Sequence, residues 1–268
     1  TNEARERLMA KIGPVAHFAK KKDCLDLPEE VDEVRKVELE PDQRKAYREM
    51  ERHLITQIKD QTIAAPFALT KLMKLRQICA GFAYSEIGEG LEISKIDPFS
   101  KYTGDPPIGQ SFSNPKLREL IDIIEEAGSQ PIIIWIQFHW EQIKVCHELY
   151  EKFGPESVVT LSSLTKDRDG SISAFKEGRA RFLVAHPASA AHGLRLVNCS
   201  LQIFFSLDFS LEKFEQAKAR IHRAGQTKSC TYVYIVAKNT IDEHILAVLR
   251  DKGDAQRIVY EMIKGVKN

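Results

Sequence analysis

The chain has 268 residues, of which 43% are hydrophobic and 29% are charged, and its net charge is +1. This composition is typical of a folded globular protein and leaves room for one large domain or two small ones. A net charge near zero argues against a histone-like or tail-type nucleic-acid binder, although it allows a local basic track.

Cysteine usage and hydropathy indicate the compartment. The five cysteines are scattered and odd in number, with no C-x-x-C pair, which fits reduced intracellular thiols and predicts neither a zinc site nor a disulfide framework. The apolar runs at 131–136 and 201–207 are too short to span a bilayer, and the N-terminus does not resemble a signal peptide. We therefore expect a cytoplasmic protein without membrane contact. Because the sequence does not begin with Met, we interpret it as a fragment or a processed product.

The part of the chain before residue 114 has a helical pattern. Pro41 opens a helix in which apolar residues recur at helical spacing up to Ile58, and a second helix is predicted over 66–80. Residues 84–113 are rich in Gly, Pro, Ser and Asp, which predicts a long loop or insertion. The expectation for residues 1–113 is therefore an all-helical subdomain with a loop or insertion at about 84–113.

After residue 114, short apolar runs alternate with helical patterns. We predict helices beginning at Asn114-Pro115, over 140–153, at Thr165, around Gln216 and at the capping box Thr240–Glu243. Strands are predicted at 131–136, 157–161, 181–185, 201–207 and 230–236. This alternation predicts an α/β fold, a parallel sheet with helices on both faces, over residues 114–250, followed by a C-terminal helix or tail over 251–268.

Ligands of such sheets bind at the carboxyl ends of the strands. The loop after Ala185 is small and polar, so its backbone could approach a ligand and hold phosphate oxygens; a plain connection is the alternative. The loop after Ile136 contains Gln137, Phe138, His139 and Trp140, which suit contacts with a nucleic-acid backbone or stacking on bases. Packing of the two aromatic residues against the next helix is an equally open alternative.

The segment from Gln216 to Gln226 is the most informative one. On a helix, Gln216, Arg220 and Arg223 are spaced i, i+4 and i+7 and share one face. Two guanidinium groups and an amide on one face would suit a polyphosphate, because each guanidinium can bind two phosphate oxygens. Gly225 would then end the helix. The alternative is a solvated face whose arginines complement the helix dipole.

Several catalytic motifs are absent. The sequence has no G-x-x-x-x-G-K-[ST] loop, no Asp-Glu pair at a strand end and no other familiar nucleotide or hydrolase signature. The acidic residues Asp242 and Glu243 lie in the predicted capping box, so we expect no metal site. The chain thus has arginines suited to a nucleotide but nothing to hold one alone.

These segments, in this order, resemble the second RecA-like lobe of Swi/Snf-type ATPases, a branch of the superfamily-two helicases. The strongest match is the family's final motif, Q-x-x-x-R-x-x-R-x-G-Q, which spans 216–226 and continues through 231–235 and 240–246. Residues 133–140 and 182–196 are similar to the fourth and fifth motifs, and 186–193 is similar to phage and bacterial members. Parts of the helical region also fit the family.

The resemblance implies roles for individual residues. Arg220 and Arg223 would be arginine fingers that reach ATP and Mg held mainly by a first lobe, which is absent from this sequence. The nucleotide side would also include Gln216, Gly193 and Asp208. The side facing the DNA backbone would include Gln137, Phe138, Ser162, Ser189 and His192. We expect a DNA-dependent helicase or translocase of a bacterial or phage-infected cell, inactive as this chain alone.

The sequence leaves two alternatives open: a non-catalytic nucleic-acid or protein-docking module that retains the lobe fold, and an RNA-directed helicase. It also departs from the family at three places. Arg195 replaces an Asn, Phe209 replaces a Trp, and Ala190-Ala191 replaces a glycine pair. These changes leave the ATPase role intact and bear on the family's remodelling-type coupling.

Overall fold

The protein is described by a computed structural model that covers residues 7, 10–11, 26–59, 65–84, 109–190 and 194–252. Its centre is a six-stranded sheet with the order β1-β8-β7-β4-β6-β5, in which all neighbouring strands are parallel. The strands are β1 Glu30–Val37, β4 Ile132–Trp135, β5 Val158–Leu161, β6 Phe182–Ala185, β7 Leu201–Phe204 and β8 Cys230–Ala237. The predicted parallel sheet is confirmed.

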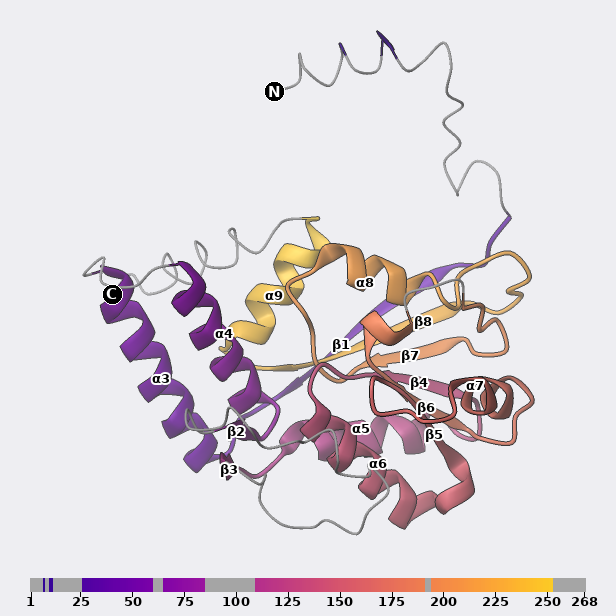
Figure 1. The fold of residues 1–268 in the computed structure, drawn as a ribbon, viewed down its shortest axis with the longest axis horizontal. Coiled ribbons are helices and arrows are strands. Elements are labelled where there is room, and N and C mark those ends of the chain that lie inside the picture. The colour runs from indigo at the N-terminus through magenta and orange to yellow at the C-terminus, as the bar shows by residue number, and fades with distance from the viewer. Residues whose placement is uncertain are drawn as a thin grey trace.

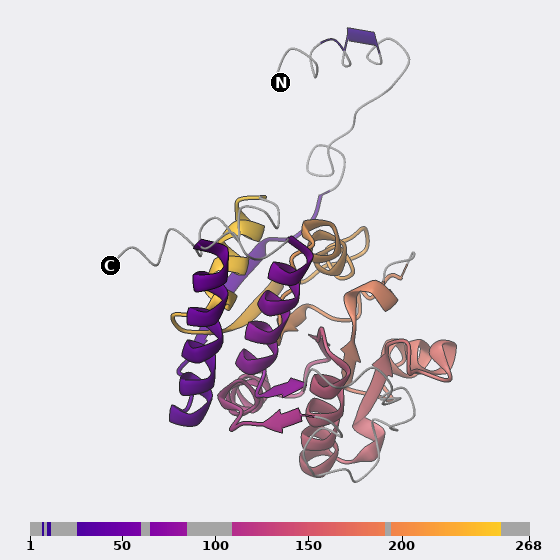
Figure 2. The ribbon, with the colours of Figure 1, turned by 60° about the vertical axis from the view of Figure 1, so that its left-hand side comes forward.

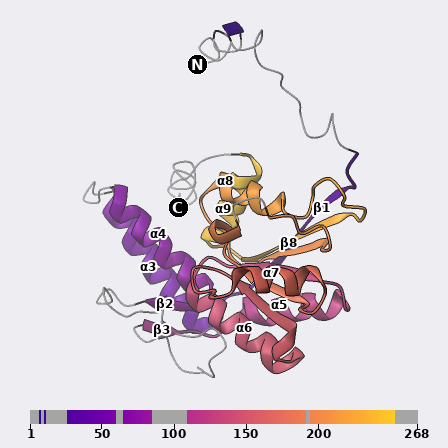
Figure 3. The ribbon, with the colours of Figure 1, turned by 45° about the vertical axis from the view of Figure 1, so that its right-hand side comes forward.

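Helices cover both faces of the sheet, as predicted. Figure 1 shows α8 and α9 on one side of the sheet and α5 and α6 on the other, and Figure 3 shows the same layers from another direction. The central strands β4, β6 and β7 are buried along their whole length, as expected of parallel strands covered on both faces. The helices of this region are α5 Pro115–Glu126, α6 His139–Phe153, α7 Arg168–Lys176, α8 Leu211–Lys218 and α9 Ile241–Arg250.

Two helices lie beside one end of the sheet: α3 Pro41–Lys59 and α4 Ala65–Cys79. They pack against each other, and α4 also contacts α9, as Figure 2 illustrates. Next to α4, β2 Phe82–Tyr84 and β3 Gly109–Ser111 form a small antiparallel pair. Most of the predicted loop or insertion at 84–113 lies outside the described residues.

The expectation that residues 1–113 are all helical is wrong at β1. Glu30–Val37 is an edge strand, and its backbone pairs in parallel with β8 in a register that places Val37 opposite Ala237. The strand carries charged residues because, within the described residues, one of its edges is unpaired and much of its surface is exposed. The partner strand lies about 200 residues later, so no local pattern reveals the pairing.

The start of α7 also differs from the prediction. The helix begins at Arg168, and the Asp167 side chain caps it by accepting a hydrogen bond from the Gly170 amide at 2.8 Å. Thr165 instead accepts a hydrogen bond from the Ser162 amide at 2.9 Å, which closes the turn after β5. The predicted C-terminal helix or tail at 251–268 lies almost entirely outside the described residues. Among the described helices, none combines the length and apolarity needed to cross a bilayer.

Candidate functional site

The loop after β4 is held in place by one buried carboxylate. Glu141, which is 2% exposed, accepts hydrogen bonds from the Gln137 and Phe138 amides at 2.7 and 3.0 Å. The same oxygen also accepts the Ser206 hydroxyl at 2.7 Å, which joins this loop to the one after β7. Burial raises the pKa of Glu141, although these donors oppose the shift. The half-buried side chains of Gln137 and Phe138 therefore project from a fixed backbone.

The candidate residues after β5 and β6 occupy different environments. Ser162 is buried, and its hydroxyl accepts a hydrogen bond from the Leu164 amide at 3.1 Å, so it stabilises the turn. Ser189 is half-buried, and its carbonyl accepts a hydrogen bond from Arg168 at 2.6 Å. His192 and Gly193 lie outside the described residues.

His186 and Asp208 lie near each other at the carboxyl edge of the sheet. Burial and the positive charge of Lys213 lower the pKa of His186, while Asp208 opposes this shift. The Asp208 carboxylate accepts hydrogen bonds from Lys213 at 2.8 Å and from the Phe209 amide at 2.7 Å. Burial by itself would raise the pKa of Asp208, but these bonds and the positive charges around it lower it. Asp208 is thus ionised and already surrounded by cations.

The predicted helical face of Gln216, Arg220 and Arg223 is wrong. Helix α8 ends at Lys218, and residues 219–225 form successive turns and bends. The helix ends early because side chains from other elements bind its last carbonyl groups. The Gln202 amide donates to the Ala217 carbonyl at 3.0 Å, and the Tyr232 hydroxyl donates to the Lys218 carbonyl at 3.2 Å.

The two arginines of this loop differ in exposure. Arg220 is buried at 6% exposure; its Nη1 donates to the Leu194 carbonyl at 3.4 Å, and its own carbonyl accepts the Leu196 amide at 3.0 Å. Burial and the positive charge of Arg223 lower the pKa of Arg220. Arg223 is exposed. The Gln216 amide, still on α8, donates to Glu212 at 2.9 Å.

Gln226 fixes the end of the arginine loop, residues 219–225. Its buried side chain donates to the Cys199 carbonyl at 2.8 Å, and its oxygen accepts the amides of Thr227 and Lys228, each at 3.0 Å. Gly225 has φ +93°, a conformation that favours glycine, and a Cβ atom there would lie 2.2 Å from the Arg195 guanidinium. The glycine and glutamine of the motif therefore shape the loop that carries the arginines.

The candidate residues thus form two groups. Gln137, Phe138, His186 and Asp208 follow strands at the carboxyl edge of the sheet. Arg220 binds residues 194 and 196, and Arg223 lies three residues later in the same loop. Asp208, predicted for the nucleotide side, lies at the carboxyl edge and pairs with Lys213. Within the described part of the chain, no group of three or more His, Cys, Asp or Glu residues is arranged to hold a metal ion.

Sequence reasoning missed the polar residues that hold these loops. Glu141 could have been found, because it stands three residues after Phe138 at the start of a helix, where a carboxylate can bind the preceding amides. Arg76 had no local signal, because it binds the Leu207 carbonyl, 131 residues later in the chain. Lys213 and Arg168 appear in sequence as ordinary surface charges.

The chain is similar to helicase-family proteins in two comparisons. Residues 115–225 match the family described as "Helicase conserved C-terminal domain". The chain is 27% identical over 251 residues to putative protein p41 of Acyrthosiphon pisum secondary endosymbiont phage 1, covering 90% of this chain and 48% of that protein. It is 27% identical over 137 residues to a Xenopus laevis SWI/SNF-related regulator of chromatin, subfamily A-like protein 1, covering 51% of this chain and 14% of that protein.

Solved structures show the same fold. The C-terminal part of the Fun30 ATPase domain superposes with a TM-score of 0.62 at 16% identity, covering 90% of this chain and 97% of that one. The Sulfolobus solfataricus SWI2/SNF2 ATPase core in complex with dsDNA superposes with a TM-score of 0.59 at 24% identity, covering 93% of this chain and 50% of that one. The predicted RecA-like fold is confirmed. The chain spans about half the length of p41 and a smaller part of the Xenopus protein.

Proposed function

We propose that this chain is the arginine-bearing half of a DNA-dependent ATPase. The match of residues 115–225 to the helicase C-terminal domain and the fold shared with a Swi/Snf second lobe support this proposal. The observation that carries the proposal is the arginine loop. Arg223 is exposed, three residues after the buried Arg220, and Gln226 fixes the end of the loop that carries both. The loop is fixed by internal hydrogen bonds and exposes a permanently charged guanidinium. Such a group suits the phosphoryl group of an ATP molecule bound to another lobe.

The residues of this lobe would act by charge and position. ATP and Mg would be held mainly by a first lobe. When the lobes close, Arg223 would stabilise negative charge that develops on the γ-phosphoryl group in the transition state. Arg220 is buried, so it would position the loop that carries Arg223 and would also add positive charge.

The carboxyl-edge loops would contact the DNA backbone. Gln137 and Phe138 are half-buried on a backbone that Glu141 fixes, so they can make a contact without prior ordering. Ser189 lies on the neighbouring loop, and His192 and Gly193 follow it in sequence. Contacts of this type read the phosphate backbone and not the bases, which suits a protein that moves along DNA.

Two alternative functions make different demands on the same residues. A docking module has no need of Arg220 and Arg223 together, so replacing them would leave its binding unchanged. An RNA-directed helicase would be stimulated by duplex RNA at least as strongly as by duplex DNA. The S. solfataricus structure was solved with dsDNA, which favours DNA as the first ligand to test.

The test of the finger role is Arg223→Ala in a protein that contains this lobe together with an ATP-binding lobe. Turnover should fall by about a thousandfold, whereas the Kd for ATP should change by less than about threefold, because the interaction forms in the transition state. The matched control is Arg179→Ala, an exposed arginine paired with Glu177 at 2.8 Å on the loop that enters β6. Equal turnover in the two variants would contradict the proposal.

A further inference from the structure

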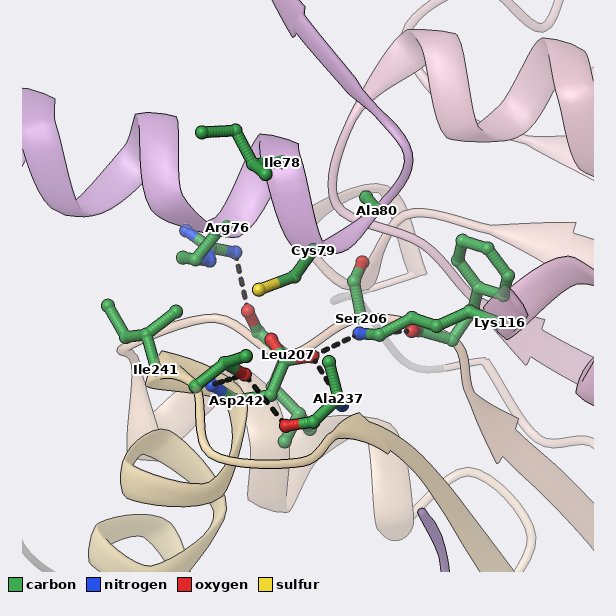
Figure 4. Close-up of polar contacts among 12 residues, drawn as sticks. Arg76, Ile78, Cys79, Ala80, Lys116, Ser206, Leu207, Ala237, Ile241 and Asp242 are labelled. Carbon is green, nitrogen blue, oxygen red and sulfur yellow. Dashed lines mark hydrogen bonds and ion pairs between the residues drawn. The ribbon is translucent and has the colours of Figure 1, made fainter. Parts of the chain in front are cut away.

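Arg76 lies where helix α4 meets the chain that leaves strand β7. Its side chain is 7% exposed, and its Nη2 donates to the Leu207 carbonyl at 2.5 Å. Its Nη1 is 3.7 Å from the Asp208 carboxylate. Figure 4 shows the guanidinium reaching down from α4 to the Leu207 oxygen. A residue of the N-terminal helices therefore binds the segment that precedes α8.

The same guanidinium contacts two aromatic rings from different loops. Its Cζ lies 5.1 Å from the ring centroid of Phe138, after β4, and 4.8 Å from that of Phe209, after β7. Both distances are in the range of cation–π attraction. Arg76 thus joins the candidate DNA-contacting loop to the segment that leads into α8.

A charged side chain at the buried position of Arg76 carries a desolvation cost. Burial lowers its pKa, while Asp208 and Glu141 oppose the shift, and an arginine remains protonated in proteins. An apolar side chain of similar volume could fill this space without the desolvation cost of a charge. A planar guanidinium, in contrast, can stack on two rings and bind a carbonyl at the same time.

A second contact connects the same two loops. The carboxylate of Glu141, which binds the Gln137 and Phe138 amides, also accepts the Ser206 hydroxyl. Ser206 is the residue before Leu207, so the Arg76 and Glu141 contacts fall on adjacent residues. The start of the same segment is fixed by Lys116, which donates to the Phe205 carbonyl at 3.3 Å.

We infer that Arg76 is a positioning residue that couples the loop carrying Gln137 and Phe138 to the arginine loop. A shift of Phe138 on contact with DNA moves the guanidinium against the Leu207 carbonyl and Phe209. Helix α8 begins two residues after Phe209, at Leu211, and leads to residues 219–225. This inference rests on the proposed function, because it assigns a coupling role between its two sides.

The test is the stimulation of ATP turnover by duplex DNA, expressed as the rate with saturating DNA divided by the rate without it. It is measured in a protein that contains this lobe and an ATP-binding lobe. Arg76→Met should reduce this ratio at least about fivefold, the lower end of typical coupling effects. The control is Leu75→Ala, a fully buried neighbour on α4 whose apolar side chain cannot hydrogen-bond either loop. Leu75→Ala should lower the Tm but keep the ratio within about twofold, because it removes core packing and leaves the contacts of Arg76 with the two loops in place.

The outcomes separate coupling from stability. A ratio in Arg76→Met that equals the unsubstituted value overturns the inference, and so does an equal loss in Leu75→Ala. If Arg76→Met does not fold, Arg76→Lys decides by the same ratio, since lysine keeps the charge but not the planar face. Absence of DNA stimulation in the unsubstituted protein would instead refute the proposed function, and the inference with it.

Discussion

Arg220 and Arg223 are three residues apart, yet they occupy different environments. Arg220 is buried and bound to the Leu194 carbonyl, whereas Arg223 is exposed. Replacing Arg220 therefore disturbs the loop as well as any charge it supplies. Arg223→Ala is the cleaner test of a finger, because an exposed side chain can be removed without leaving buried groups unpaired.

The last glutamine of the motif has a structural task that stability measurements can reveal. Gln226→Leu would leave the Cys199 carbonyl and the amides of Thr227 and Lys228 without their partner. The bond to the Cys199 carbonyl is buried, whereas Thr227 and Lys228 are exposed, so water can bind their amides. At about 1–3 kcal/mol for an unsatisfied buried group, the free energy of unfolding should fall by roughly 1–3 kcal/mol. Urea denaturation of this chain measures the change.

The control for that measurement is Gln216→Leu. Gln216 is half-buried and bonded only to Glu212 among the described contacts. The free energy of unfolding should change by no more than about 0.5 kcal/mol. Equal destabilisation by the two leucine variants would contradict the structural role of Gln226.

At this scale the structure corrects where the predicted residues of the motif lie. The motif spacing predicts roles for Gln216, Arg220 and Arg223, and these stay predictions, but the helical face that was meant to align them does not exist. The residues that end α8, Gln202 and Tyr232, lie on neighbouring strands. Their hydrogen bonds arise only after the sheet has formed, so periodicity along the chain could not reveal them.

At the scale of elements, a buried ion pair joins helices α5 and α9. Lys116 is 1% exposed at the start of α5, and it pairs with Asp242 in the first turn of α9. Lys116 also binds the Phe205 carbonyl, and Asp242 accepts the Ala237 amide at 3.1 Å, as Figure 4 illustrates. The pair therefore fixes two helices to the ends of β7 and β8.

Lys116→Met should destabilise the chain strongly. The change leaves the Asp242 carboxylate buried without its cation, which typically costs about 3–5 kcal/mol. The double variant with Asp242→Asn should recover part of this loss, because the second change removes the unpaired charge. Chemical denaturation of the three proteins measures both effects.

A surface pair provides the comparison. Lys152 and Glu125 lie 3.5 Å apart, and their side chains are 42% and 61% exposed. Lys152→Met should cost no more than about 1 kcal/mol, since water screens exposed ion pairs. A loss of similar size in Lys116→Met would show that the buried pair does not hold α5 and α9 together.

The limits of sequence reasoning at this scale lie in long-range pairing. The strands β4, β6 and β7 were predicted because they are short apolar runs, the pattern of strands buried on both faces. Strand β1 was missed because it is charged and because its partner in the described sheet, β8, lies far away in the sequence. Its alternation is too weak to distinguish an edge strand from a helix or a loop.

At the scale of the whole molecule, the structure is one lobe with two groups of candidate residues. The carboxyl-edge loops and the arginine loop are connected by α8 and by the segment 205–209, which Arg76, Lys116 and Glu141 hold. In the proposed function, DNA contacts the carboxyl-edge loops and ATP on a first lobe contacts the arginine loop. A change at one group of residues can affect the other ligand only when both ligands are bound. We therefore propose that the activity requires a first lobe that holds ATP.

The measurement that tests this account most directly is ATP hydrolysis, with and without duplex DNA, by this chain and by a protein that joins it to an ATP-binding lobe. The account predicts no turnover by the chain alone and DNA-stimulated turnover by the two-lobe protein, lost on Arg223→Ala. Turnover by the isolated chain would contradict the account. So would a two-lobe protein that binds DNA in a salt-sensitive manner but does not hydrolyse ATP, a result that would favour a docking module.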